Sequence, residues 1–181
     1  MKHLTFSVLF ISVLATTWTL VPTYNNRNIE PHGHDVVMSK QIGAFNAFTT
    51  TQAESFSYAN DVEIESCTDT LGAQQVDFIE AGDVIAYYDM DFQNGAYRVD
   101  IRVATRDDFA TIGYINLHLG NATTLPFASI LTRNTPDYTW VTLSQYIEDV
   151  PTGIQDLYFT FTSDDAFSHI TDFNWFQFNK D

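Results

Sequence analysis

The stretch 80–106 constrains the fold more than any other part of this 181-residue chain. Apolar and polar side chains alternate from Tyr97 to Val103, which is the period-two pattern of a β-strand with one buried face. A second run, 83–92, is rich in β-branched and aromatic residues that favour a pleated sheet. The pair Asn94-Gly95 between the two runs is typical of tight turns. The stretch therefore predicts two antiparallel strands joined in a hairpin.

The composition extends this prediction to the whole domain. The chain contains 15 Phe, 9 Tyr and 3 Trp, residue types that suit sheets and a large aromatic core. Further candidate strands, separated by turn-forming Gly, Pro, Asn and Asp residues, lie at 51–58, 62–66, 75–79, 111–119, 126–131, 138–143, 154–162 and 170–178. This number and spacing predict an all-β fold, a two-sheet β-sandwich of jelly-roll type.

The chain divides into three predicted segments. Residues 1–21 begin with a basic residue and continue with an apolar stretch, which is the pattern of a secretory signal peptide. An uncleaved membrane anchor is the alternative, because the apolar character continues to Val21. Residues 22–44 are polar and patternless, as in a flexible linker, and residues 45–181 form the sandwich. We therefore expect a secreted protein, or one anchored by its uncleaved first segment.

The net charge of the chain limits the classes of molecule that it can bind. The formal net charge is −15 at pH 7, so the surface repels nucleic acid and anionic lipid. Neutral sugars, cations and basic proteins remain possible partners. Cys67 is the single cysteine, which excludes an internal disulfide. The stability of an exported domain would then come from the aromatic core or from a bound ion.

The histidines give a weaker metal signal. His32 and His34 lie beside Asp35 in the predicted linker and offer ligands for a transition metal. A flexible segment lacks the preorganised surroundings of real metal sites, so a solvated linker is the favoured interpretation. His118 and His169 are isolated in the sequence and are interpreted as surface or packed imidazoles.

Four segments stand in an order and spacing that resemble those of a known family: QAESF at 52–56, FIEAGDVIAYYDMDF at 78–92, GAYRVDIRVAT at 95–105 and DFNWFQF at 172–178. Together they resemble carbohydrate-binding module family 6 over about residues 47–181. The resemblance implies a lectin-like β-sandwich, usually attached to glycoside hydrolases, that holds calcium and binds polysaccharides. The chain departs from the family at Val84, where Trp is usual.

The resemblance also implies a sugar-binding cleft at the loop end of the sandwich. By position, its two flanking rings are Phe78, where Tyr is usual, and Tyr138, where Trp is usual, while Asp172 stands where an Asn binds the sugar. Aromatic faces stack on pyranose rings and a carboxylate accepts hydrogen bonds from hydroxyls, so this set suits a neutral polysaccharide. The alternative interpretation places Phe78 in the core and Tyr138 at a strand edge.

The calcium site implied by the resemblance uses Gln52, Glu54 and Asn174. Their side-chain oxygens are the hard donors that Ca²⁺ takes in sets of six to eight. Gln52 and Glu54 are two residues apart, so we expect them on one face of the first strand, with Asn174 in the last strand. The ion would then tie the two strands together. The alternative is that all three are solvent-facing strand residues.

The leading prediction is a non-catalytic protein that binds a neutral polysaccharide and holds a structural calcium ion. It would act alone, with a glycoside hydrolase or at a cell surface. A small jelly-roll hydrolase or lyase is one alternative, with carboxylate pairs such as Glu63 and Glu65 or Asp89 and Asp91. A structural or adhesive surface protein with a decayed sugar cleft is the other. No serine-hydrolase, nucleotide-binding or metalloprotease motif occurs in the sequence.

Overall fold

A computed structural model of the chain describes residues 44–70, 72–105, 113–132, 135, 138–164 and 169–181. The predicted signal peptide or anchor, residues 1–21, lies outside the described residues, as does the predicted linker except for residue 44. The three segment boundaries and the metal-binding potential of His32 and His34 therefore stay predictions. Within the described part, no helix has the length and apolar character needed to cross a membrane.

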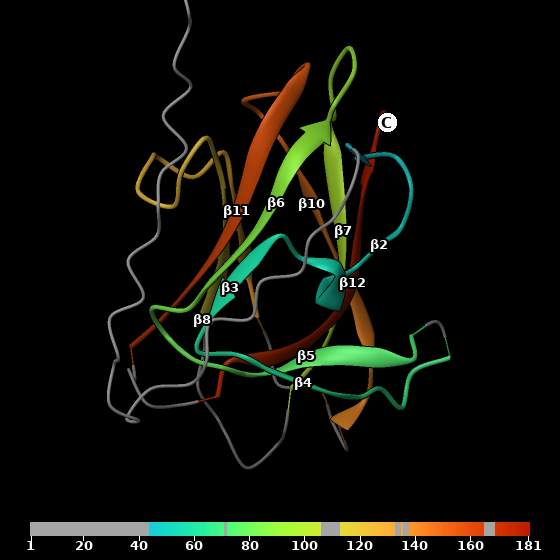
Figure 1. Cartoon of the computed structure of the whole chain (residues 1–181), viewed down its shortest axis with the longest axis vertical. Helices are drawn as coiled ribbons and strands as arrows, with labels where there is room; N and C mark the ends of the chain where they lie inside the picture. The colour runs from blue at the N-terminus through green and yellow to red at the C-terminus, as the bar shows by residue number, and fades with distance from the viewer. Residues whose placement is uncertain (1–43, 71, 106–112, 133–134, 136–137, 165–168) are drawn as a thin grey trace, which may run out of the picture. The chain divides into compact units, whose positions relative to one another are not determined.

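The described residues form two sheets of six strands each (Figure 1). The first sheet has the order β1-β6-β11-β8-β9, with β3 also pairing β6; its strands are β1 (Phe45–Asn46), β3 (Tyr58–Asn60), β6 (Val84–Asp91), β8 (Gly113–Leu119), β9 (Ala128–Leu131) and β11 (Ile154–Ser163). The second has the order β10-β7-β12-β5-β4, with β2 also pairing β12; its strands are β2 (Thr51–Gln52), β4 (Glu63–Ser66), β5 (Gln74–Ile79), β7 (Arg98–Ala104), β10 (Val141–Tyr146) and β12 (Thr171–Asn179). The predicted all-β, two-sheet sandwich is confirmed.

The two strands predicted as a hairpin exist, but they do not pair with each other. β6 lies in the first sheet and β7 in the second. The loop between them crosses from one sheet to the other: Phe92 N–H donates to the Gly153 carbonyl, whereas Tyr97 N–H donates to the Asn179 carbonyl of the second sheet. The hairpin prediction was wrong because period-two alternation shows that a strand has one buried face without identifying its partner. Switching between sheets at successive strands is the jelly-roll connection.

The predicted strand 51–58 is broken into three elements. β2 ends at Gln52, a 3₁₀ turn η1 (Ala53–Ser55) follows, and β3 begins at Tyr58 in the other sheet. The Ser55 hydroxyl donates to the Gln52 carbonyl at 2.6 Å, a local bond that competes with sheet pairing. The turn thus carries the chain from the second sheet to the first.

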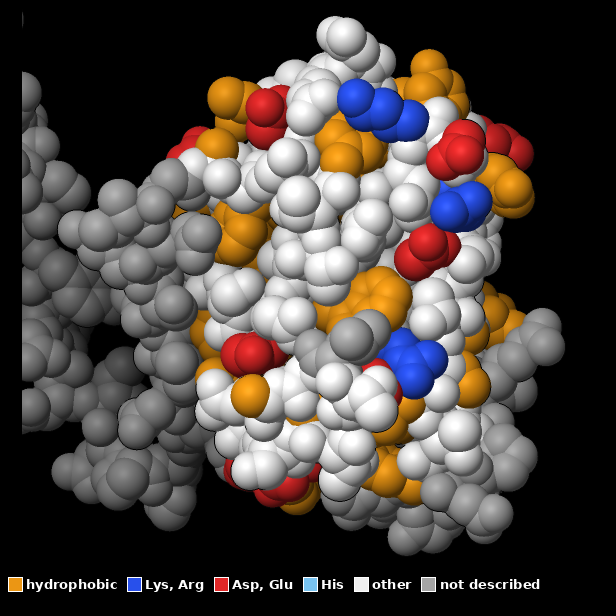
Figure 2. Space-filling view, turned by 90° about the vertical axis from the view of Figure 1, so that its right-hand side faces the viewer, with side chains coloured by type: hydrophobic (Ala, Val, Ile, Leu, Met, Phe, Trp, Pro, Cys, Tyr) orange, Lys and Arg blue, Asp and Glu red, His pale blue; other side chains and the backbone are white. Residues whose placement is uncertain are grey.

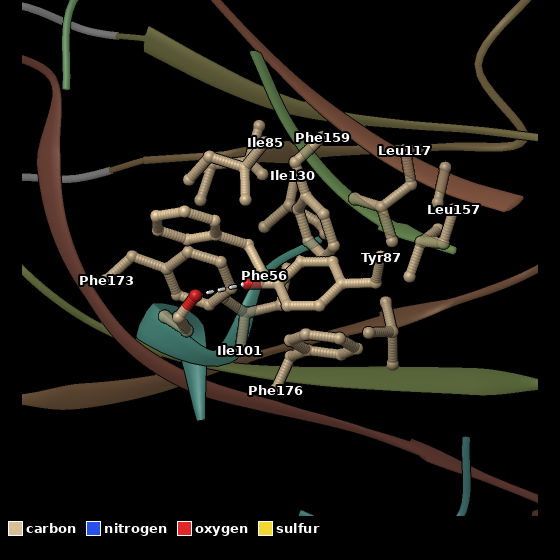
Figure 3. Packing of buried hydrophobic residues seen from close by; sticks show 14 of the residues in the cluster. Phe56, Ile85, Tyr87, Ile101, Leu117, Ile130, Leu157, Phe159, Phe173 and Phe176 are labelled. Atoms are coloured by element: carbon tan, nitrogen blue, oxygen red, sulfur yellow. Dashed lines mark hydrogen bonds between the residues drawn. The ribbon is translucent and has the colours of Figure 1, made fainter. Parts of the chain in front are cut away.

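Aromatic side chains fill the space between the sheets, as the composition predicted (Figure 3). The Tyr87 ring of β6 and the Phe159 ring of β11 lie 4.8 Å and 5.0 Å from the Phe176 ring of β12, measured between centroids. Burying one such side chain stabilises the fold by about 1.5–3 kcal/mol. The Tyr87 hydroxyl donates to the Ala53 carbonyl at 2.7 Å, which ties η1 to the core.

The basic side chains of the described surface lie close to acidic ones and do not gather into a basic patch in the view of Figure 2. Arg98 pairs with Asp100 at 3.3 Å and Arg102 pairs with Asp69 at 2.7 Å, measured between nitrogen and oxygen. These pairs cancel positive charge locally. A polyanion would therefore find little attraction on this face.

Candidate functional site

A β-bulge in β5 determines the position of Phe78. The register between β5 and β12 shifts so that Asp77 and Phe78 together lie opposite the single residue Asp172. Phe78 has a φ of +55°, a region that bulky side chains rarely adopt. Its side chain is 49% exposed, whereas Asp77 is buried. Bulges commonly re-aim a side chain next to a functional site, and here the bulge places Phe78 on the surface and not in the core.

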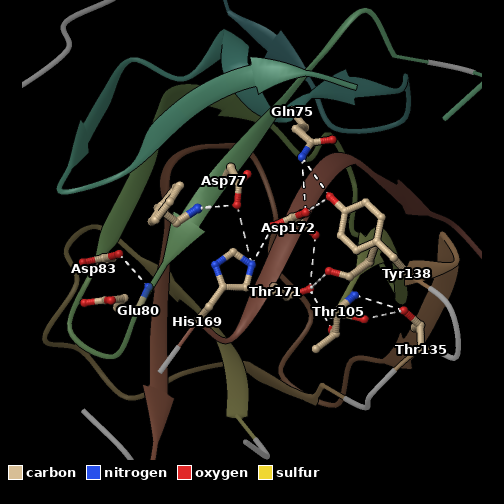
Figure 4. Close-up of polar contacts among 12 residues, drawn as sticks. Gln75, Asp77, Glu80, Asp83, Thr105, Thr135, Tyr138, His169, Thr171 and Asp172 are labelled. Atoms are coloured by element: carbon tan, nitrogen blue, oxygen red, sulfur yellow. Dashed lines mark hydrogen bonds and ion pairs between the residues drawn. The ribbon is translucent and has the colours of Figure 1, made fainter. Parts of the chain in front are cut away.

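Tyr138 is the second large aromatic residue of the described part with a positive φ, also +55°. Its ring is partly exposed and lies edge-on to Trp140, with centroids 6.2 Å apart. Its hydroxyl donates to Asp172 Oδ2 and accepts from Gln75 Nε2 at 3.0 Å (Figure 4). Such backbone conformations cost of the order of 1–3 kcal/mol each and concentrate at binding sites.

Asp172 lies at the centre of this cluster and is itself fully buried. Its Oδ2 accepts from Gln75 Nε2 at 3.2 Å as well as from Tyr138, and its Oδ1 lies 2.6 Å from His169 Nε2 (Figure 4). The His169 ring in turn meets the Phe78 ring edge-on, with centroids 6.2 Å apart. The fold thus connects the three predicted sugar-binding residues through one chain of contacts.

Sequence reasoning missed three residues of this cluster: Gln75, Asp77 and His169. His169 is a packed imidazole, one of the two interpretations given above, and its Nε2 lies between Asp77 Oδ1 at 3.6 Å and Asp172 Oδ1 at 2.6 Å. Burial raises the pKa of the Asp77 carboxyl, but a hydrogen bond with Asp172, another from the Phe78 N–H and the His169 imidazole outweigh burial and lower it. The sequence carries no signal for this contact, because residues three apart in an extended strand lie on opposite faces.

The predicted calcium ligands lie in β12 or on elements that contact it, but not all of them lie in strands. Gln52 at the end of β2 lies opposite Trp175 of β12. Glu54 is in η1, which packs against β12 and β5, so the expectation that Gln52 and Glu54 share a strand face was wrong. Asn174 is the extra residue of a second bulge, where β12 pairs with β7. A turn and a bulge therefore build this group.

The oxygen atoms of this group fit a cation. Gln52 Oε1, Glu54 Oε2 and Asn174 Oδ1 are each buried and have no hydrogen-bond partner among the described residues. Burial raises the pKa of the Glu54 carboxyl, although a backbone hydrogen bond partly offsets it. Leaving buried polar atoms unpaired costs about 1–3 kcal/mol each. A calcium ion held by these three oxygens would remove that cost.

Contacts behind Asn174 orient its side chain. Asn174 Nδ2 donates to Asp69 Oδ2 at 3.0 Å, and Asp69 also accepts two hydrogen bonds from Arg102, at 2.7 Å and 3.1 Å. A Cβ atom at Gly72 would lie 2.1 Å from Asn174 Oδ1, so no larger residue fits there unless Asn174 moves. These contacts leave Asn174 Oδ1 as the atom directed away from Asp69.

Replacing Asp69 by Asn is expected to lower the free energy of unfolding by about 1–2 kcal/mol at pH 7, because the bidentate bond to the partly exposed Arg102 is lost. The hydrogen bond from Arg102 is the main cause that lowers the Asp69 pKa below 3.8. A depressed folded pKa stabilises the protein above the unfolded pKa and ceases to do so as the pH falls through the folded value. Urea unfolding with chelator present should therefore show the difference from wild type shrinking below about pH 3.8. A difference that stays constant with pH would contradict this role.

A comparison with known families identifies the domain. A family model described as "Carbohydrate binding module (family 6)" matches residues 52–180. The chain belongs to carbohydrate-binding module family 6. Membership confirms the predicted resemblance, and it makes non-catalytic carbohydrate binding the function of the module and oligosaccharides or polysaccharides its partners. Family 6 modules are typically extracellular.

Solved structures of family 6 modules share the sandwich. CsCBM6-3 from Clostridium stercorarium, in complex with cellobiose, is 27% identical with a TM-score of 0.65, over 77% of this chain and 98% of that chain. A family 6 module from Clostridium cellulolyticum, in complex with xylose, is 27% identical with a TM-score of 0.66, over 75% and 99%. A Bacillus subtilis family 43 arabinoxylan arabinofuranohydrolase, in complex with cellotetraose, is 25% identical with a TM-score of 0.70, over 79% of this chain and 29% of that chain. The similarity therefore covers nearly all of the first two solved chains and a part of the enzyme chain.

Proposed function

We propose that this family 6 module binds a neutral polysaccharide at the surface formed by Phe78 and Tyr138, with Asp172 beneath them. The observation that carries the proposal is that both rings are held at a φ of +55° and reach solvent, on either side of the contact between His169 and Asp172. Flat rings at such positions stack on the C–H faces of a pyranose. Because Asp172 is fully buried, it acts by fixing the Tyr138 side chain through the hydrogen bond that the Tyr138 hydroxyl donates.

The proposed ligand class is a β-linked glucan or xylan. It is supported by the cellobiose, xylose and cellotetraose named with the similar structures. The formal charge of −15 supports a neutral glycan over an anionic one. Phe78 and Tyr138 offer less stacking area than the Tyr and Trp that are usual at these positions. We therefore expect weak affinity for a single site, which multivalent contact with a polymer would raise.

A structural calcium ion held by Gln52, Glu54 and Asn174 is the second part of the proposal. It is supported by three buried oxygens that have no hydrogen-bond partner among the described residues. The ion would join η1 to β12 in a domain that has no disulfide. Export by the segment 1–21 fits this proposal, because calcium is abundant outside cells and extracellular calcium sites work at 10⁻⁴–10⁻³ M.

Affinity electrophoresis tests the proposed ligand class. We expect migration of the protein to be retarded in gels that contain a soluble β-glucan or xylan, and to be unchanged in gels that contain a uronic acid polymer of similar viscosity. Retardation by none of these polymers would favour the structural or adhesive alternative. Release of reducing sugar or of unsaturated product from the same polymers would instead favour the hydrolase or lyase alternative, with Glu63 and Glu65 as the first carboxylates to replace.

A further inference from the structure

Three side chains with metal-ligating atoms converge beside the proposed sugar surface. Asp77 comes from β5, Asp172 from β12, and His169 from the segment just before β12. One ligand atom from each lies within 4.8 Å of the other two, and His169 Nε2 lies 2.6 Å from Asp172 Oδ1 and 3.6 Å from Asp77 Oδ1 (Figure 4). None of these residues belongs to the calcium group of Gln52, Glu54 and Asn174.

The three metal-ligating side chains of the cluster are buried. Asp77 and Asp172 are 1% and 0% exposed, and His169 is 8% exposed. The two carboxyl groups face one imidazole, and the carboxyl of Glu65 also hydrogen-bonds Asp77. Burying net charge is costly. A divalent cation bound to two carboxylates and a neutral imidazole would bring the charge of the three groups and the ion to zero.

Gln75 is a further buried polar side chain next to Asp172. Gln75 is 3% exposed, and its amide group is directed at Asp172, to which Nε2 donates at 3.2 Å. Its Oε1 is buried and has no hydrogen-bond partner among the described residues. The O and N atoms of such an amide exchange places by a half-turn of the group. That half-turn would turn Oε1 toward Asp172.

We propose that Asp77, His169 and Asp172 form a binding site for a divalent transition-metal ion of the Zn²⁺ class, with Gln75 beside it. An imidazole nitrogen with carboxylate oxygens is a donor set that zinc accepts, whereas calcium takes oxygen ligands. Bonds of 2.0–2.2 Å in a tetrahedral site separate neighbouring ligand atoms by about 3.3 Å. The separations of His169 Nε2 from Asp172 Oδ1, 2.6 Å, and from Asp77 Oδ1, 3.6 Å, differ from that value by less than about 1 Å.

The metal site does not depend on the proposed sugar binding. Its ligand atoms are buried behind the Phe78 and Tyr138 rings, and metal binding is measured without any glycan. If both proposals hold, an ion on Asp172 would compete with the hydrogen bond from Tyr138. Zinc binding and glycan binding would then be coupled.

Zinc titration of the full-length protein tests the site. His32 and His34 offer competing ligands in the predicted linker, so the reference protein carries His32→Asn and His34→Asn. We expect one Zn²⁺ to bind per chain in this reference, with binding unaffected by a large excess of Ca²⁺. Co²⁺ in place of Zn²⁺ should give the visible d–d absorption of a site with nitrogen and oxygen ligands. Adding His169→Asn should weaken zinc binding by more than about 100-fold, because the substitution removes a residue that bonds the metal directly and not one that only hydrogen-bonds a ligand.

Asp77→Asn serves as the second variant, in case His169→Asn does not fold, and circular dichroism reports folding of each. It too should weaken zinc binding while retaining the fold. Absence of one-to-one zinc binding in the reference protein would overturn the proposal without any need for the variants. Zinc affinity that is unchanged in folded His169→Asn or folded Asp77→Asn would overturn it as well.

Discussion

Affinity for the polysaccharide is expected to fall about thirtyfold or more when Tyr138 is replaced by Ala, which corresponds to about 2 kcal/mol of binding free energy. The ring is half of the proposed stacking surface, and its hydroxyl anchors the side chain to Asp172. Losing the ring removes the apolar face that a pyranose covers and leaves the buried Asp172 carboxylate with one donor fewer. Affinity electrophoresis and isothermal titration calorimetry with the best polymer of the panel measure the loss.

Tyr146→Ala is the matched control for this prediction. Tyr146 is a 70% exposed tyrosine at the far end of β10, so its loss should leave retention unchanged. Tyr138→Phe keeps the ring and removes only the hydroxyl, and we expect a loss smaller than that of Tyr138→Ala. Equal retention of wild type and folded Tyr138→Ala would rule out this surface as the sugar site. Equal losses in Tyr138→Ala and Tyr146→Ala would point to another binding face or to a general defect.

Removal of calcium is the second large effect that we expect. At a calcium concentration about one hundred times its dissociation constant, an ion that binds only the folded state stabilises it by about 2.7 kcal/mol. For a domain of this size, EGTA should therefore lower the melting temperature by of the order of 5–10 °C. Adding calcium in excess of the chelator should restore it. Differential scanning calorimetry measures both steps.

Glu54→Gln tests whether these residues hold the ion. The variant loses the one carboxylate of the group, so its melting temperature should be nearly insensitive to EGTA. Glu148→Gln, which removes an exposed carboxylate elsewhere, should respond to EGTA as wild type does. A melting temperature of the wild type that does not change on chelation and calcium return would show that the site is absent. The same EGTA response in Glu54→Gln as in wild type would place the ion on other residues.

The two candidate sites differ in how far the sequence could predict them. Phe78 and Tyr138 were predicted by position, but their exposure depends on a positive φ and on a bulge that breaks strand alternation. A bulge inserts one extra residue into one of two paired strands, and no residue type in β5 predicts it. His169 was dismissed because its partner Asp77 is 92 positions away in sequence. Only the pairing of β5 with β12 brings the two together.

The residues of the calcium group were predicted from the sequence, but their local structure was not. Gln52, Glu54 and Asn174 were predicted as a set, and their oxygens are buried and unpartnered. The argument that a two-residue spacing places Gln52 and Glu54 on one strand face was wrong, because the strand ends at Gln52. A 3₁₀ turn replaces the strand geometry. The spacing of Gln52 and Glu54 could not distinguish a strand from a 3₁₀ turn, since the same short polar run is compatible with either.

The sequence by itself determined that this chain is an all-β sandwich with an aromatic core, because alternation and residue type decide which faces must be buried. It also determined membership of family 6. The tertiary structure alone decided that β6 and β7 lie in different sheets, that bulges expose Phe78 and place Asn174, and that Asp77 meets His169. The physical reason is that burial patterns are local properties of a strand, whereas strand partners and bulges depend on contacts between residues far apart in the chain.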